Sequence, residues 1–214
     1  MSGLRERKRR RTRETIASAA LRLFRESGFD GVSVADIAAE AEISKPTLFA
    51  YFPTKEDLVI HQFADDNGPA EIVRARPDGV SALSALERSF LDRLAEHDPL
   101  TGLNDSPDAI TCHTLLYSTP ALLARLATYL LAKEQELVEE LQASCGIEDE
   151  FTARLVAAQI FGAQRILGFH NAREIRAGRS ADETYPDAVA RAEAAYRVLR
   201  DGLSSVLGQS AGHS

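Results

Sequence analysis

Three consecutive residues, Lys45, Pro46 and Thr47, carry side chains that can contact the edges of nucleic-acid bases. The Lys45 ammonium can donate to O6 or N7 of guanine, Thr47 can form a hydrogen bond or touch a thymine methyl, and Pro46 offers apolar contact. A helix in the major groove of DNA contacts base edges with its N-terminal residues. We therefore expect these residues to begin a helix and to face bases.

Further groups around this triplet suit the phosphate backbone. Tyr51 and Lys55 carry a hydroxyl and an ammonium that can donate to phosphate oxygens. Ser33 and Ser44 stand where helices are expected to begin, and the amides at helix starts bind phosphate. Phe49 is also expected to be exposed on this helix, but it has no hydroxyl.

A helix-turn-helix must hold these side chains. Ser33 is expected to cap a short helix in which Asp36 lies near the positive end, and this helix ends near Ala41. A short turn then leads to a second helix, which begins at residue 44 or 45 and continues to Phe52.

An earlier helix completes the module. Apolar residues recur from Ile16 at steps of three and four, and Gly28 ends that helix. Thr54 is expected to cap a fourth helix, with Asp57 as its capping partner. The expected core consists of Ile16, Leu23, Phe24, Val34, Ile37, Ala38, Ile43, Leu48 and Phe52.

The first 13 residues form a strongly basic segment in a chain whose formal net charge is −7. The remainder is acidic, and this asymmetry indicates two separate tasks. We expect residues 1–13 to be a disordered arm that contacts DNA through Arg10, Arg11 and Arg13. A minor-groove role and a phosphate role both stay open for this arm.

Composition indicates a folded protein of a reducing compartment. With 214 residues, 44% of them hydrophobic, the chain can form a small module and a larger domain. Its two cysteines, Cys112 and Cys145, give no disulfide framework. No apolar run approaches the roughly 18 residues of a membrane span. The expected location is the cytoplasm, at the nucleoid.

The rest of the chain predicts further helices. No alternating pattern typical of strands exceeds a few residues, so the expected fold class is all-α with about nine helices. Residues 67–79 contain glycine and proline breakers and are expected to be irregular, with at most one short helical turn. The later helices are expected at Val80–Glu96, Pro107–Tyr117, Ala121–Ser144, Asp149–Ala177 and Tyr185–Leu207, with a loop at Gly178–Glu183.

Three motifs resemble those of a known family. They are Leu-Phe-x-x-x-Gly-Phe from Leu23 to Phe29, Val34-x-x-Ile37-Ala38, and Ser44-x-x-Thr47-Leu48-x-x-Tyr51-Phe52-x-x-Lys55-Glu56-x-Leu58. Residues 12–60 are thereby similar to the DNA-binding domain of the tetracycline-repressor (TetR) family of bacterial regulators. The family commonly carries tyrosine at the position of Phe49, and many members carry another residue, such as glycine, at Pro46.

The resemblance implies a homodimeric transcriptional regulator, usually a repressor, that a small molecule releases from a pseudo-palindromic operator. An activator of the same fold is the alternative. It implies a three-helix DNA-binding domain over residues 14–60 and an effector-binding and dimerisation domain over residues 61–214. The partners implied are double-stranded operator DNA, an unknown and largely apolar effector, and a second copy of the chain, with no membrane.

Two late helices carry apolar stripes that could form the dimer interface. Each helix shows more apolar surface than one neighbour needs, which suits an interface of two helices from each subunit. The alternative is that both stripes lie in the core of one chain. The candidate interface residues are Phe151, Leu155, Ala158, Gly162, Ala188, Ala192, Ala195 and Leu199.

Polar and aromatic residues set in apolar helices are the candidates for effector binding. His113 and Tyr117 lie four residues apart and share a helix face. For each candidate, ordinary packing or a hydrogen bond between helices is the competing interpretation. The candidates are Phe90, Arg93, His113, Tyr117, Gln159, Phe161 and His170.

An enzyme is the rival class, but the sequence carries no motif for one. Cys112 and His113 are adjacent, so a helix turns their side chains about 100° apart, which does not suit a nucleophile and its base. No histidine pair has metal-ligand spacing, and no glycine-rich loop could hold a phosphate. We expect no catalytic residue, metal or cofactor. A non-specific architectural DNA binder would leave the acidic domain unexplained.

Overall fold

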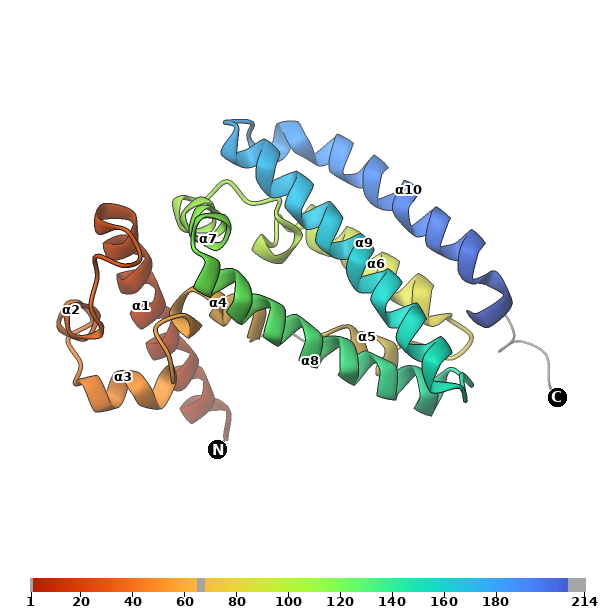
Figure 1. The fold of residues 1–214 in the computed structure, drawn as a ribbon, viewed down its shortest axis with the longest axis horizontal. Helices are drawn as coiled ribbons and strands as arrows, with labels where there is room; N and C mark the ends of the chain where they lie inside the picture. The colour runs from red at the N-terminus through yellow and green to blue at the C-terminus, as the bar shows by residue number, and fades with distance from the viewer. Residues whose placement is uncertain (1, 65–67, 208–214) are drawn as a thin grey trace. The chain divides into compact units, whose positions relative to one another are not determined.

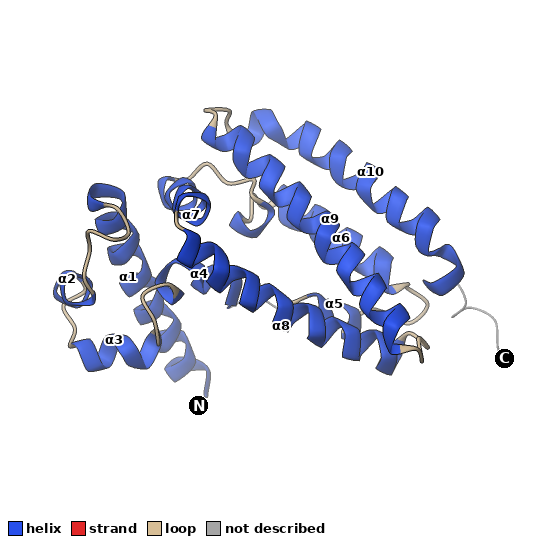
Figure 2. Cartoon of the chain, in the orientation of Figure 1, coloured by secondary structure: helices blue, strands red, loops and turns tan. Residues whose placement is uncertain are grey.

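The structure, a computed structural model, describes residues 2–64 and 68–207 (Figures 1 and 2). The elements in these ranges are ten α-helices and one 3₁₀ helix, η1, with no strand among them. The all-α prediction is confirmed. The one helix more than expected is α5 (Pro69–Arg74). It lies in the stretch 67–79, which was expected to hold at most one helical turn. The first residue of that stretch, Asn67, lies outside the described ranges.

The contacts divide the chain into two compact units. Unit 1 comprises residues 1–65 and 106–126, and unit 2 comprises residues 66–105 and 127–214. The first unit is therefore discontinuous in sequence, because a segment from the middle of the chain packs with the helix-turn-helix.

Unit 1 begins with a helix that is longer than expected. Residues 2–13, expected as a disordered arm, are helical, because α1 begins at Ser2. Arginine and lysine favour helix, and Thr12 Oγ1 donates to the Lys8 carbonyl at 3.0 Å within it. The helices of this unit are α1 (Ser2–Ser27), α2 (Val34–Glu40), α3 (Lys45–Tyr51), α4 (Asp57–Ala64), α7 (Pro107–Ser118) and the beginning of α8 (Pro120–Ser144).

The core of unit 1 is close to the predicted one. Leu23, Val34 and Ile43 are only half-buried, whereas the other predicted positions are buried. Apolar burial of this kind stabilises a module by roughly 1.5–3 kcal/mol for each large side chain. The buried members are Ile16, Phe24, Ile37, Ala38, Leu48 and Phe52.

The middle segment is attached to the helix-turn-helix by polar contacts as well as by packing. Arg25 on α1 lies 3.8 Å from the Asp108 carboxylate on α7. The Cys112 thiol donates to the Val59 carbonyl at 3.4 Å, and burial raises the pKa of this thiol to about 12. Such a thiol stays protonated and unreactive at neutral pH.

Unit 2 consists of α5, α6 (Ala82–Ala95), η1 (Pro99–Thr101), the rest of α8, α9 (Glu150–Arg176) and α10 (Ala181–Leu207). The last helix packs along α6 and α9 (Figure 1). Tyr196 is fully buried between them: its hydroxyl donates to the Leu86 carbonyl at 3.3 Å and accepts from Gln164 Nε2 at 2.9 Å. Desolvation raises the pKa of Tyr196 to about 12.

Two arginines bind α8: Arg74, the last residue of α5, and Arg76, two residues after it. Arg74 Nε donates to Glu140 Oε2 at 2.9 Å, and the buried Glu140 carboxylate is thereby paired. Arg76 Nη2 donates to the Ser144 carbonyl at 2.7 Å, so it satisfies an acceptor at the end of α8.

A buried amide fixes η1 against α9. Asn171 is fully buried, its Nδ2 donates to the Thr101 carbonyl at 2.9 Å, and its Oδ1 accepts from Arg191 Nη2 at 3.2 Å. Gly102 follows with φ +73°, and a Cβ there would collide with the Gly168 carbonyl. The chain can pass this close to α9 only because Gly102 has no side chain.

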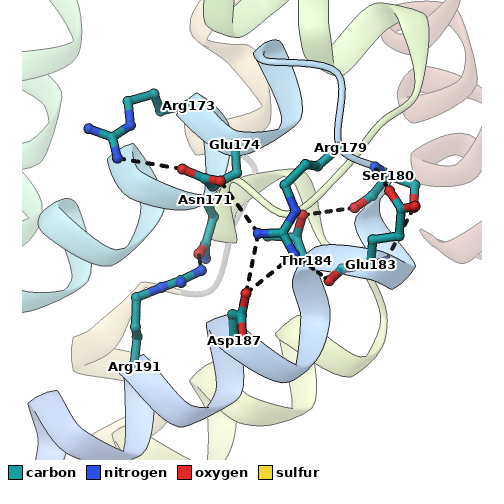
Figure 3. A network of polar contacts seen from close by, with 9 residues as sticks. All are labelled: Asn171, Arg173, Glu174, Arg179, Ser180, Glu183, Thr184, Asp187 and Arg191. Atoms are coloured by element: carbon teal, nitrogen blue, oxygen red, sulfur yellow. Dashed lines mark hydrogen bonds and ion pairs between the residues drawn. The ribbon is translucent and has the colours of Figure 1, made fainter.

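The turn between α9 and α10 is held by a cluster of charges (Figure 3). Arg179 Nη1 contacts Glu174 Oε2 at 3.4 Å and Asp187 Oδ2 at 3.2 Å. The bond to Asp187 raises the pKa of Arg179, and the bond from Arg179 lowers the pKa of Glu174. The cluster joins the last turn of α9 to the first turns of α10.

The expected loop at Gly178–Glu183 is shorter than predicted. Ser180 N donates to Glu183 Oε2 at 2.9 Å and Glu183 N donates to Ser180 Oγ at 3.2 Å, which is a capping box. This pair starts α10 at Ala181, ahead of Pro186. The Ser-x-x-Glu spacing was visible in the sequence.

No single helix in residues 2–64 and 68–207 has the length and hydrophobicity of a membrane span. Helices α7 and α8 meet that criterion only as a pair, bent by 99°.

The substitution Asn171→Ala should lower the free energy of unfolding by about 1–3 kcal/mol, because it removes the partner of the buried Thr101 carbonyl. Urea denaturation of the purified protein measures this. Gln159→Ala on the exposed side of the same helix is the control and should change stability by less than about 0.5 kcal/mol. Equal losses in both variants would contradict the role given to Asn171.

Candidate nucleic-acid interface

The start of α2 is closed by a reciprocal pair of side chains. Asp36 N donates to Ser33 Oγ at 3.2 Å, and Ser33 N donates to Asp36 Oδ2 at 2.8 Å. The hydroxyl and amide of Ser33 hold the pKa of the Asp36 carboxyl below its ordinary value, with Lys45 adding to the effect. The predicted cap at Ser33 is confirmed. Its hydroxyl forms its hydrogen bonds to Asp36, within the protein.

The turn between α2 and α3 requires an unusual backbone conformation. Glu42 has φ +52°, in the left-handed region that favours glycine. Ile43 N donates to the Ala38 carbonyl at 2.9 Å and closes the turn. This geometry sets the direction in which α3 leaves α2.

Helix α3 exposes its first turn, as predicted. Ser44 Oγ accepts from Thr47 N at 3.2 Å and lies 2.8 Å from Thr47 Oγ1, so the two hydroxyls are already connected. Lys45, Pro46 and Thr47 are exposed, and Pro46 occupies the first turn. Thr47 is thus exposed and has a hydroxyl with one bond within the protein.

The second half of α3 anchors the helix. Leu48 and Phe52 are fully buried, whereas Phe49 is 47% exposed and Tyr51 is half-buried. The buried pair lies four residues apart, on the inward face of the helix. Phe49 and Tyr51 both stay at least partly accessible, as the sequence predicted.

Lys55 is placed differently from its predicted role. Its Nζ donates to the Phe29 carbonyl and lies 4.2 Å from the centroid of the Phe29 ring and 5.6 Å from that of Phe24. The ammonium is held between α1 and the segment before α2 by a hydrogen bond and cation–π contacts. Lys55 therefore helps to position the module, and its phosphate contact stays a prediction.

The predicted arginines of the first segment separate into an inner and an outer set. Arg13 is half-buried, and its guanidinium lies 5.1 Å from the centroid of the Phe52 ring. Arg10 and Arg11 are exposed, and Arg10 lies 3.6 Å from the Glu14 carboxylate. Arg11 also lines an open cleft of about 580 Å³ between α1 and the end of α2, beside Glu14 and Glu40.

The candidate effector residues do not all belong to one unit. His113 (buried) and Tyr117 (exposed) lie on α7 in unit 1, whereas the others lie in unit 2. Phe90 is buried against Tyr196, with ring centroids 6.2 Å apart, and so is a packing residue. Of the other unit 2 candidates, Gln159 is exposed, and Arg93, Phe161 and His170 are partly exposed.

The two predicted interface stripes differ in the structure. On α9, Phe151 and Leu155 are 73% and 50% exposed, Ala158 is exposed and Gly162 is partly exposed. The stripe continues to Ile166 and Phe169, which are also exposed. This face of α9 is open along its length in the described chain.

On α10 the prediction was wrong for three of four positions. Ala188, Ala192 and Leu199 are buried, since this face packs on α6 and α9 within the chain, and only Ala195 stays partly exposed. Val198, which is 73% exposed, marks the outer face instead. A periodic stripe shows that a helix face is covered but does not tell which element covers it.

One contact of the helix-turn-helix unit had no signal in the sequence. Asp57 Oδ2 accepts from Thr54 N at 3.0 Å, as the predicted cap requires, and Asp57 Oδ1 accepts from Arg125 Nε at 2.9 Å. Arg125 lies on α8, 68 residues further along the chain. The cap of α4 is thus shared with a helix that local spacing could not reveal.

Comparison with known proteins gives three similarities. Residues 16–61 match the family described as "Bacterial regulatory proteins, tetR family". The HTH-type transcriptional regulator TcmR of Streptomyces glaucescens is 30% identical over 171 residues, which are 77% of this chain and 75% of TcmR. A crystal structure described as a TetR-family regulator, from Mesorhizobium loti, matches 91% of this chain and 97% of its own with a TM-score of 0.54; at 16% identity this shows likeness of fold alone.

Glu42→Gly should raise the free energy of unfolding by about 0.5–1 kcal/mol, because glycine adopts the left-handed conformation without steric cost. Urea denaturation measures the change. Glu42→Ala keeps a Cβ at this position and serves as the matched control, with no comparable gain. If alanine stabilises as much as glycine, the effect comes from the lost charge and not from the backbone.

Proposed function

The chain belongs to the tetR family of bacterial regulatory proteins, and on that premise we propose that it represses transcription by binding a pseudo-palindromic operator as a homodimer. It is a DNA-binding transcriptional regulator. The finer proposal includes release of the operator by a small-molecule effector and action at the nucleoid, in the cytoplasm.

The observation that carries the proposal is the exposed first turn of α3. Lys45, Pro46 and Thr47 are accessible while Leu48 and Phe52 hold the helix from behind. A recognition helix needs this combination of a free N-terminal turn and a fixed inner face. We assign base contacts to these three residues and backbone contacts to Tyr51 and to the amides that Ser33 and Ser44 precede.

Dimer formation is supported by the apolar face of α9. Four large hydrophobic side chains on this face are each more than two-fifths exposed in the described chain: Phe151, Leu155, Ile166 and Phe169. A second copy meeting this face about a two-fold axis would bury it in both subunits. The same two-fold axis would present two α3 helices to half-sites about 34 Å apart.

Effector binding is assigned to unit 2. The candidates that stay accessible there are Arg93, Gln159, Phe161 and His170, and the packing of Phe90 against Tyr196 lies in the same unit. An effector that binds the conformation unable to bind the operator more tightly than the DNA-binding conformation would raise the fraction of protein released from DNA. The difference between these two affinities limits the size of the shift. Sequencing of genomic DNA bound by the purified protein would locate the operator and name neighbouring genes that suggest the effector's chemistry.

Lys45→Ala should weaken binding to the selected operator by about 1–3 kcal/mol, while binding to an unrelated duplex changes less. Fluorescence anisotropy at fixed salt measures both. Lys133→Ala on α8 removes the same charge from unit 2 and is the control, with no preferential loss on the operator. Equal losses of Lys45→Ala on the two duplexes would assign Lys45 to phosphate, and a wild-type footprint without two-fold symmetry would contradict the proposed operator.

Leu155→Asp should convert the homodimer into monomers at micromolar concentration, because it places a charge in the middle of the apolar face of α9. Analytical ultracentrifugation measures the mass. Leu131→Asp makes the same change at a residue of α8 that is 66% exposed, and this variant should stay dimeric. A dimeric Leu155→Asp protein with unchanged affinity would place the interface elsewhere.

A further inference from the structure

The N-terminal end of α1 continues beyond the helix-turn-helix as a basic helix. We call residues 2–11 the basic extension. Its described side chains Arg7, Lys8, Arg9, Arg10 and Arg11 are all exposed. A helix of this length reaches about 15 Å past the packed part of α1.

The basic extension is fixed to the module at its C-terminal end. Arg13 lies over the ring of Phe52, the residue directly after α3, and Ile16 is buried one turn further on. Thr15 Oγ1 donates to the Arg11 carbonyl at 2.9 Å and Thr12 Oγ1 to the Lys8 carbonyl at 3.0 Å. The C-terminal end of the extension therefore lies beside the C-terminal end of α3, where Figure 1 shows α1 passing the end of α3.

Arg7, Lys8 and Arg11 form a stripe along the extension. On a helix, residues three and four apart lie on one face, and adjacent residues differ by about 100°. Arg10 lies about 100° around the helix from Arg11, and its guanidinium is 3.6 Å from the Glu14 carboxylate. The stripe is a linear set of positive charges, held in line by the backbone.

The width of a helix decides which part of DNA such a stripe can bind. A helix with its side chains is about 10–12 Å across, whereas the minor groove of B-DNA is about 6 Å wide. A disordered arm could enter that groove, but a helix cannot. The phosphate backbone presents a line of negative charge that a row of guanidinium and ammonium groups can follow from outside.

We propose that the basic extension binds the phosphate backbone of duplex DNA, flanking the groove that α3 occupies, as a preformed helix. It contributes affinity that does not depend on base sequence. The inference rests on the proposed function in that α3 brings the module to DNA, but it assigns a second contact surface with a different chemistry. It also decides between the two roles that the sequence left open.

A charge-removing variant tests the contact. Arg7→Gln, Lys8→Gln and Arg11→Gln together keep helix propensity and remove three charges from each subunit. Affinity should fall at least tenfold at about 100 mM salt, by the same factor on the operator and on an unrelated duplex. The slope of log affinity against log salt should become shallower by about 0.9 for each phosphate that the variant no longer neutralises.

The matched control keeps the charges. Arg7→Lys with Arg11→Lys should retain the affinity within about threefold and the salt slope, because phosphate contact needs charge more than the planar guanidinium. Minor-groove contact would behave differently, since it distinguishes A·T from G·C pairs. A loss in the lysine variant that occurs only on duplexes with A·T-rich flanks would overturn the proposal.

A second pair of variants tests whether the helix itself matters. Arg9→Pro and Arg9→Ala remove the same charge, but proline breaks the helix in the extension while alanine preserves it. The proline variant should bind both duplexes more weakly than the alanine variant, with a smaller salt slope. Equal binding by the two would show a flexible charged arm and refute the helical contact.

Failure of this inference and failure of the proposed function give different results. If the extension variants bind like the wild type while Lys45→Ala still loses operator binding, the basic extension is not a DNA contact and the regulator assignment stands. If no sequence is preferred over the unrelated duplex, the operator proposal fails, yet the extension variants should still lose affinity for any duplex.

Discussion

The ring of Phe52, directly after α3, is contacted by side chains of α1 and α4 in unit 1, and the exposed turn of α3 depends on these contacts. Phe52 is fully buried directly after α3, Arg13 of α1 covers its face at 5.1 Å, and His61 of α4 meets it edge-on at 5.9 Å. Burial of a large aromatic ring contributes about 1.5–3 kcal/mol, and the cation over it adds to this. The direction of α3 and the attachment of the basic extension to the module are thereby set by the same side chain.

Unit 2 relies on buried polar groups that have found partners. Tyr196 and Gln164 satisfy one another across α9 and α10, and Asn171 joins η1 to α9. Each bond contributes only about 1 kcal/mol, but leaving one partner unpaired in the core costs more. The outer face of α9 carries large exposed apolar side chains instead. The inner face of α9 therefore packs within the chain, whereas its outer face suits a partner outside it.

Local signals in the sequence predicted most of what is local in the structure. The caps at Ser33, Ser44 and Thr54 formed as expected, because each depends on groups within three residues. Helix α10 begins earlier than expected, because the prediction did not use the Ser180 and Glu183 pair that caps it.

What the sequence could not predict depends on distant partners. Lys55 carries the right charge for phosphate, but the Phe29 carbonyl and two rings, brought close by the fold, hold it in place. Ala188 and Ala192 have the spacing of an interface, yet α6 and α9 cover them. The basic segment was expected to be disordered because charge dominates its composition; continuity with α1 makes it helical.

The discontinuity of unit 1 has a consequence for synthesis of the protein. A ribosome-bound chain that ends at residue 64 contains α1 to α4 but lacks Asp108, Cys112 and Arg125, which contact Arg25, Val59 and Asp57 in the finished unit. Unit 1 therefore completes its packing only after residue 126 has left the ribosome, when much of unit 2 has still to be made. Contacts of such long sequence separation also slow folding.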